Sequence, residues 1–223
     1  MLQKLLSWSF ALACIFLLGS CVEIIDDLKL NEDGSGTWKL RINCSESAVK
    51  INSILALDSL NGYRVPSKDD LRVRSSRFRF VIAQQKGIKS AAFTEDLEHY
   101  IWTLNVDFET LEELEKAITF ALEDQNVKGI NLPENGFVRM KNKEISKQFP
   151  FDLSKLNEKI KQEDRSKLFE GKYISILRFN LAISSISNPR YAISKNQMAT
   201  MAQFKLGECI QNSRIINNII TLK

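Results

Sequence analysis

The chain has 223 residues, of which 44% are hydrophobic and 26% are charged, with 9 Gly, 4 Pro, 4 Cys and a single His. These proportions are typical of a globular protein, and they exclude disordered, collagen-like and disulfide-dense chains, most multi-His metal sites and zinc-finger arrays. The formal net charge is +4, from 31 Lys and Arg against 27 Asp and Glu. Because nucleic-acid-binding proteins usually carry a concentrated basic stripe, this mild balance predicts no nucleic-acid partner.

Residues 1–20 have the organisation of a secretory signal peptide. Lys4 opens the segment, residues 5–18 are almost wholly apolar, and two small residues follow. The apolar run has about 14 residues, which is fewer than the ~20 that a transmembrane helix needs. The sequence Leu18-Gly19-Ser20-Cys21 that ends the segment resembles the lipobox of bacterial lipoproteins.

The resemblance implies that Cys21 is the site of lipid attachment. In this family a diacylglyceryl group is joined to the cysteine sulfur, and signal peptidase II then cleaves before the cysteine, here between Ser20 and Cys21. Because two acyl chains hold a protein stably at a bilayer, we expect the membrane to be a partner through lipidated Cys21. Val22 replaces the Asp that retains enterobacterial lipoproteins at the inner membrane, so the resemblance favours the outer membrane, with the domain facing the periplasm. An ordinary signal peptide and an uncleaved anchor are the alternative interpretations.

The domain is predicted to begin directly after Cys21. Residues 22–25 predict a strand, residues 33–36 (Asp-Gly-Ser-Gly) predict a turn, and the alternation of apolar and polar residues over 37–43 predicts a second strand. No Gly- or Ser-rich tether separates the lipid from this hairpin. We therefore expect the domain to lie against the headgroups.

The next elements are predicted from capping residues and periodicity. A helix beginning at Ser45 or Ser47 is expected to end near Gly62. Alternation predicts strands over 77–83 and over 100–108, of which the second is the strongest strand signal in the chain.

The second half of the chain continues this mixture. Thr110 and Glu113 fit a capping box, and the apolar residues after it recur at helical spacing as far as Leu122. The remaining predicted elements are a hairpin over 137–149, a helix from Asp152, a strand over 173–184, a helix over 197–212 and a strand over 215–222.

Amphipathic helices interspersed with hairpins predict an α+β fold. The expected architecture is an antiparallel sheet of hairpins, with the amphipathic helices packed on one face. We expect residues 1–20 to be removed and residues 21–223 to form a single domain. The segment 125–135, which contains Gly129 and Pro133, is compatible with a division into two lobes, although the pattern does not require one.

Cys44 and Cys209 are the cysteines left after removal of the signal and lipidation of Cys21. In a compartment that permits disulfides, an even pair can bond, and this bond would join the start of the domain to its end. The alternative is that both are small buried side chains.

The sequence carries no motif for catalysis or for a cofactor. His99 has no second His or nearby Cys with which to form a metal site, and no G-x-S-x-G, G-x-G-x-x-G or Walker sequence is present. Pairs of acids such as Asp26-Asp27 are interpreted as solvated charge, because neighbours in a strand point to opposite faces. We therefore predict no catalytic residue, no cofactor and no metal.

The densest basic run comprises Arg72, Arg74, Arg77, Arg79 and Lys86. One hypothesis is that these cations face anionic headgroups or lipopolysaccharide phosphates. The other, which the differing parity of the positions favours, is an edge strand whose charges prevent further pairing.

Four aromatic residues leave a further choice open. Phe78, Phe80, Tyr100 and Trp102 fit either a pocket for an apolar ligand or ordinary core packing. The order of elements after Cys21 resembles small envelope lipoproteins of Gram-negative, Bacteroidetes-like bacteria. The leading hypothesis is therefore a non-enzymatic module that binds an envelope protein or another envelope component. The alternative is a carrier or sensor of an apolar ligand held between sheet and helices, and an enzyme is third.

Overall fold

The structure is a computed structural model that describes residues 22–60, 63–125, 132–133, 136–150 and 169–223. Its strands are β1 (Glu23–Leu30), β2 (Gly36–Asn43), β3 (Ser59–Leu60), β4 (Tyr63–Arg64), β5 (Ile88–Asp96), β6 (Ile101–Phe108), β7 (Val138–Lys141), β8 (Glu144–Lys147), β9 (Lys172–Phe179), β10 (Ile183–Ile186), β11 (Ala192–Ile193), β12 (Ala199–Lys205) and β13 (Asn218–Leu222). Its helices are the short η1 (Ser45–Ser47), α2 (Ala48–Leu55), α3 (Lys68–Ala83), α4 (Leu111–Asp124), α7 (Leu206–Gln211) and the short η2 (Ser213–Ile216). This mixture confirms the predicted α+β class.

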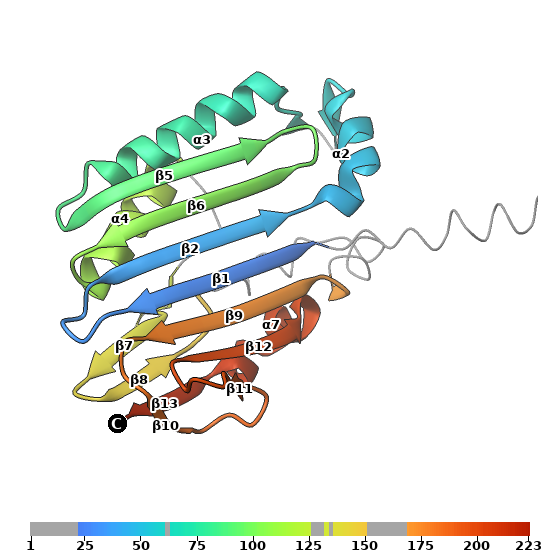
Figure 1. Ribbon diagram of the computed structural model, residues 1–223. Helices are drawn as coiled ribbons and strands as arrows, with labels where there is room; N and C mark the ends of the chain where they lie inside the picture. Colours follow the sequence, from blue (N-terminus) through green and yellow to red (C-terminus); the bar gives the residue numbers. More distant parts are fainter. Residues whose placement is uncertain (1–21, 61–62, 126–131, 134–135, 151–168) are drawn as a thin grey trace, which may run out of the picture.

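Two larger sheets organise most of these elements (Figure 1), and β3 pairs with β4 in a third sheet of two strands. The main sheet has seven strands in the order β11-β12-β9-β1-β2-β6-β5, and a second sheet has four in the order β10-β13-β8-β7. All pairs in the main sheet are antiparallel except β1 with β9, which run parallel. Strands from both sides of residues 125–135 therefore belong to one sheet, with β1 at its centre.

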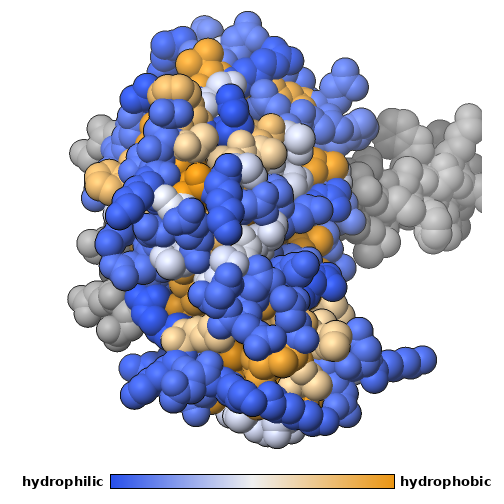
Figure 2. Space-filling view, turned by 60° about the vertical axis from the view of Figure 1, so that its left-hand side comes forward, coloured by the Kyte–Doolittle hydropathy of each residue, from blue (hydrophilic) through white to orange (hydrophobic). Residues whose placement is uncertain are grey.

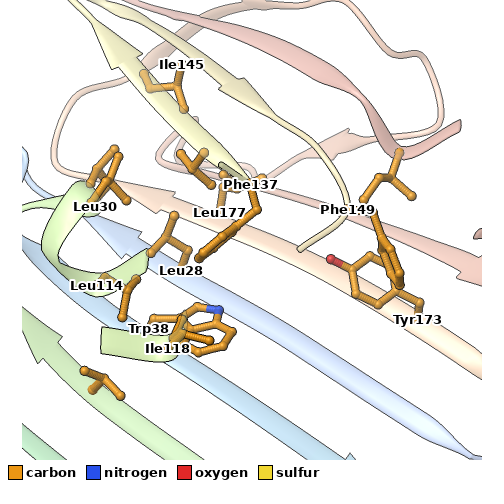
Figure 3. Close-up of a cluster of buried hydrophobic side chains, with 14 of the residues drawn as sticks. Leu28, Leu30, Trp38, Leu114, Ile118, Phe137, Ile145, Phe149, Tyr173 and Leu177 are labelled. Atoms are coloured by element: carbon orange, nitrogen blue, oxygen red, sulfur yellow. The ribbon is translucent and has the colours of Figure 1, made fainter. Parts of the chain in front are cut away.

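The core lies on one face of the main sheet. Figure 3 shows Leu28 and Trp38 of that sheet directed toward Leu114 and Ile118 of α4 and toward Phe137, which precedes β7. The rings of Trp38 and Phe137 are 5.5 Å apart. Helices α3, α4 and α7 pack on one face as predicted, and the second sheet, which was not predicted, covers part of the same face.

Residues 77–83, predicted as a strand, are the second half of α3. The helix begins at a capping box in which the Ser67 hydroxyl accepts from the Asp70 N–H at 3.0 Å and the Asp70 carboxylate accepts from the Ser67 N–H at 2.9 Å. In the helix Ile82 is buried and Phe78 packs against the core, whereas Phe80 is 50% exposed. Phe78 and Ile82 are four residues apart, so the alternation that resembled a strand conceals a helical face.

The helix predicted over 197–212 is also wrong in its first half, which forms β12. Thr200, Ala202 and Phe204 are buried and the residues between them are exposed, as in a strand with one covered face. The predicted strand over 173–184 is interrupted after Phe179, because the chain turns there and enters the second sheet as β10.

Other local predictions are confirmed. At α4 the Thr110 hydroxyl accepts from the Glu113 N–H, while its proton goes to the Glu113 carboxylate at 3.2 Å, so the N-cap forms without the complete capping box. The hairpin over 137–149 forms as β7 and β8 and turns at Asn142, whose φ is 55°. The helix predicted from Asp152 lies outside the described residues.

Candidate functional site

A buried cluster of polar side chains surrounds Asp26 on the covered face of the main sheet. Asp26 is fully buried, and its Oδ1 accepts a hydrogen bond from Trp38 Nε1 at 2.7 Å. Its Oδ2 accepts from Lys147 Nζ and from the Tyr173 hydroxyl, each at 2.5 Å. The carboxylate therefore meets three donors within the protein and no solvent.

Three strands of the main sheet and one of the second sheet place these groups. Asp26 lies on β1, Trp38 on β2 and Tyr173 on β9, which are neighbours in the main sheet. Lys147 comes from β8, and its ammonium also lies 4.9 Å from the centre of the Phe137 ring. The ion pair of Asp26 and Lys147 thus connects the two sheets across the core.

The electrostatics of the cluster keep the tyrosine proton in place. Burial, followed by the nearby Asp26 carboxylate, raises the pKa of Tyr173 well above its usual value. The hydroxyl therefore remains a donor to Asp26. The cluster is buried and its ion pair spans both sheets, so we interpret it as an element that fixes the two sheets together.

Asp26 corrects the expectation that the pair Asp26-Asp27 is solvated. Only Asp27 points to the open face, where it accepts from Arg178 Nε at 2.9 Å. The signal for burial was present in the sequence, because Asp26 has the same parity as Leu28 and Leu30, which face the core. A charge at an inward position indicates a buried partner, although nothing local identifies Lys147.

The lipobox residues Leu18 to Cys21 lie outside the described residues. The described chain starts at Val22, whose carbonyl accepts from the Lys172 N–H at 2.7 Å, and β1 begins at Glu23. The first strand therefore starts two residues after the predicted lipid attachment site. Within the described residues, no helix combines the length and hydrophobicity needed to cross a bilayer.

Cys44 and Cys209 are both free thiols in the structure, so the disulfide considered from the sequence is not formed. Cys44 follows β2, and Cys209 lies buried in the short helix α7. Burial raises the pKa of Cys44 and raises that of Cys209 to about 12. Cys209 matches the alternative of a small buried side chain, whereas Cys44 is only partly buried.

The four arginines of the basic run lie on α3 and Lys86 lies in the turn after it, so these residues do not form the edge strand that their parity suggested. Arg77 makes a bidentate contact with Asp124 of α4, with Nη2 to Oδ1 at 2.6 Å, and Arg72 pairs with Asp69 at 2.7 Å. The first contact connects α3 to α4, and the second joins two residues near the start of α3. They give two of the arginines a role within the protein.

The four aromatic residues do not gather in one pocket. Tyr100 is buried, with its ring 6.2 Å from that of Trp102, whereas Phe80 is half-exposed on α3 beneath Arg77. Phe78 packs at the margin of the core. This distribution matches ordinary packing for Phe78 and Tyr100, whereas Trp102 is only partly buried.

His99 is an exposed turn residue. Its Nδ1 lies 2.7 Å from Asp96 Oδ2, and its N–H donates to the same carboxylate at 3.0 Å. The backbone N–H and then the ring of His99 lower the pKa of Asp96. Among the described residues, no group of three His, Cys, Asp or Glu side chains is arranged to hold a metal ion.

A surface groove of about 620 Å³ lies at the end of the main sheet that is opposite to the start of β1. It is lined by the β1–β2 turn, the first turn of α4 and the β7–β8 hairpin. Arg139 on its wall donates to Glu115 at 2.7 Å, and the same carboxylate accepts from the Phe137 N–H at 2.8 Å. Figure 2 brings this end of the molecule forward and shows a mainly hydrophilic surface, with hydrophobic residues gathered in its lower part.

No protein-family model matches the chain, and no curated protein matches it either. In structure it is similar to the folded domain of Mycobacterium tuberculosis LppM, solved by NMR, with a TM-score of 0.43 and 10% sequence identity. The similarity covers 92% of this chain and 91% of that one. At this distance the likeness assigns the chain neither to a family nor to a function.

The strongest functional signal thus remains the resemblance of residues 18–21 to a lipobox, and the structure adds two features to it. The first is that a central strand begins beside the lipobox. The second is the groove at the far end of that strand, which was not predicted because its three walls come from separate segments.

Proposed function

We infer that the protein is a lipoprotein of the bacterial cell envelope, anchored through a diacylglyceryl group on Cys21. The observation that carries this conclusion is the sequence Leu18-Gly19-Ser20-Cys21 at the end of a signal-like segment. Cleavage between Ser20 and Cys21 would leave the lipid two residues before β1. Val22 favours the outer membrane, with the domain facing the periplasm.

The folded domain acts as a non-enzymatic binding or structural module in this proposal. Support comes from the groove, which is a concave surface accessible to a partner, and from the buried ion pair of Asp26 and Lys147, which joins the two sheets that carry its walls. The groove has charged residues on each of its walls, among them Asp33, Glu112 and Arg139, so it suits a polar envelope protein or another polar envelope component.

The anchor is tested by replacing the thiol. Cys21→Ser should prevent lipidation and cleavage, and metabolic labelling with a palmitate analogue should fall to background. The matched control is Cys44→Ser, which removes a thiol from the folded domain and should leave labelling intact. Mass spectrometry of the mature N-terminus gives the independent readout, and a wild-type N-terminus other than modified Cys21 would contradict the proposal.

The binding role is tested in the native envelope. Crosslinking from a photoreactive residue at Asn142, on the groove, should retain a specific envelope component, whereas a probe at Ile219, which is 46% exposed on β13, should not. An apolar molecule that copurifies in stoichiometric amount, with no crosslink at the groove, would favour the carrier and oppose the binding module.

A further inference from the structure

An apolar surface is exposed at the end of the molecule where the chain leaves toward Cys21. Helix α2 lies at the end of the main sheet where β1 begins (Figure 1), and it contains no buried residue. Val49 is 81% exposed and Leu57, just beyond the helix, is 46% exposed. Ser53 lies between them, and we call these three residues the α2 surface.

The α2 surface is less polar than its composition suggests. The Ser53 hydroxyl donates its proton to the Val49 carbonyl at 2.9 Å, so its donor needs no partner from solvent. Positions 49, 53 and 57 are four residues apart and therefore lie on the same side of the helical segment. This side of the helical segment thus presents two apolar side chains and one hydroxyl whose proton is already hydrogen-bonded within the helix.

Contacts with the main sheet fix the position of this helix. The hydroxyl of buried Tyr100 donates to Asn52 Oδ1, and the Tyr100 carbonyl accepts from the Cys44 N–H at 3.0 Å. These bonds hold both the entry to α2 and its middle. Val49 and Leu57 are therefore exposed on a helical segment whose start and middle are fixed by Tyr100.

The short connection to Cys21 indicates that the bilayer covers the α2 surface. Glu23 pairs with Asn43 at the end of the sheet, and the chain from Asn43 reaches α2 through η1. Two residues of extended chain span at most ~7 Å, so an acyl group on Cys21 holds the bilayer surface close to this end of the sheet. A tether this short gives the domain little freedom to turn another surface toward the lipid.

We propose that Val49 and Leu57 insert into the headgroup region of the bilayer that holds the lipidated Cys21. This inference rests on the proposed lipid anchor and adds a second contact to it. The charges beside the α2 surface are of both signs, as Glu46 and Lys50 show, so burial of apolar side chains drives the contact. The contact should therefore be insensitive to salt.

The orientation of the domain follows from this contact. Strand β1 runs away from the anchored end and has eight residues, and a strand rises ~3.3 Å per residue, so its far end lies about 26 Å away. The groove between the β1–β2 turn, α4 and the β7–β8 hairpin is at that end. Insertion of α2 thus directs the groove away from the membrane.

The test uses the lipidated full-length mature protein in vesicles of phosphatidylethanolamine and phosphatidylglycerol. Single Val49→Trp and Leu57→Trp variants report insertion through quenching by brominated acyl chains, after subtraction of the signal of the unsubstituted protein. The matched control is Val73→Trp, which replaces a 69% exposed valine on α3. We expect at least twofold stronger quenching at positions 49 and 57 than at 73, unchanged between 0.1 and 1 M salt.

The outcomes separate this inference from the anchor on which it rests. Protein that lacks the lipid mass and does not float with vesicles overturns the proposed function. Protein that is lipidated and floats, with tryptophans at 49 and 57 no more quenched than at 73, overturns the insertion alone. Stronger quenching at 73 also overturns it and assigns the contact to the basic surface of α3.

Discussion

The Lys147 ammonium lies 2.5 Å from the Asp26 carboxylate, and the side chains of both residues are 0% exposed. The two residues are 121 positions apart and belong to different sheets. A buried charge is tolerated only when its partner is present, because desolvation of a lone ion costs several kcal/mol. This pair therefore makes the docking of the second sheet dependent on two particular residues.

Removal of one partner should be strongly destabilising. Asp26→Asn leaves the ammonium of Lys147 buried without a counterion, and we expect a loss of ~3–5 kcal/mol in the free energy of unfolding, measured by urea denaturation. The double variant Asp26→Asn with Lys147→Met removes both charges and should recover at least half of that loss. A single variant that costs less than ~1 kcal/mol, the range of exposed pairs, would show that the pair is solvated.

Gly36, at the start of β2, should not accept a side chain. A Cβ at this position would lie 2.1 Å from the Lys29 carbonyl oxygen and 2.8 Å from Phe108 Cζ. Because the first contact is with the backbone of β1, we expect Gly36→Ala to cost about 3 kcal/mol in thermal or urea unfolding. The control is Gly34→Asn in the same turn, where φ is +84° and nothing lies within 4 Å, with an expected cost of ~1 kcal/mol or less. Equal costs at the two positions would argue against the close contact of β1 and β2.

The stability of the domain should fall in alkaline solution. Burial raises the pKa of Cys209 from 9.0 to about 12 and that of Tyr173 well above 10.0, so both groups keep their protons longer in the folded state. Above pH 9 the unfolded chain releases protons that the folded chain retains, and the free energy of unfolding therefore decreases as the pH rises. Each such group contributes about 1.4 kcal/mol per pH unit between its two pKa values.

Urea titrations between pH 7 and pH 11 measure this slope. Cys209→Ala removes one of the groups and should make the decline between pH 9 and pH 10 shallower, whatever its effect on stability at pH 7. A slope identical to that of the wild type would mean that the Cys209 thiol titrates normally.

The two thiols of the domain should be free in the mature protein. Alkylation of the denatured protein without reductant should add one group to Cys44 and one to Cys209, as read by peptide mass spectrometry. Without denaturation Cys209 should react far more slowly at pH 8, because its thiol is buried and its pKa is about 12. A linked Cys44–Cys209 peptide before reduction would instead restore the disulfide considered from the sequence.

Elements with a strong local signal were predictable from the sequence. The unbroken alternation of β6 and the Thr110 cap of α4 act over neighbouring residues, and both elements form where expected. The α3 helix was missed because arginines alternate with Phe78 and Phe80, which reproduces the period of a strand within a helix that Ser67 and Asp70 start.

Long-range relationships could not be predicted in the same way. The parallel pairing of β1 with β9 joins Glu23 to Lys172, and no local pattern specifies such a partner. The inward parity of Asp26 does indicate burial, but its counterion lies in a sheet that only the folded chain defines. The proposed lipobox differs from both, because the types and order of residues 18–21 alone, without the fold, are the basis of that proposal.

The central position of β1 in the main sheet determines how the fold resists a pulling force applied at its N-terminal end. This strand is the fourth of seven in the main sheet, flanked by β2 and β9 along its full length. Tension applied through residue 21 acts along the strand axis and loads the hydrogen bonds of both neighbours in shear at the same time, so that many must break together. A chain that entered through an edge strand would instead peel open one bond after another. If Cys21 carries the lipid as proposed, the connection at Glu23 makes the fold mechanically resistant along the direction in which the anchor pulls it.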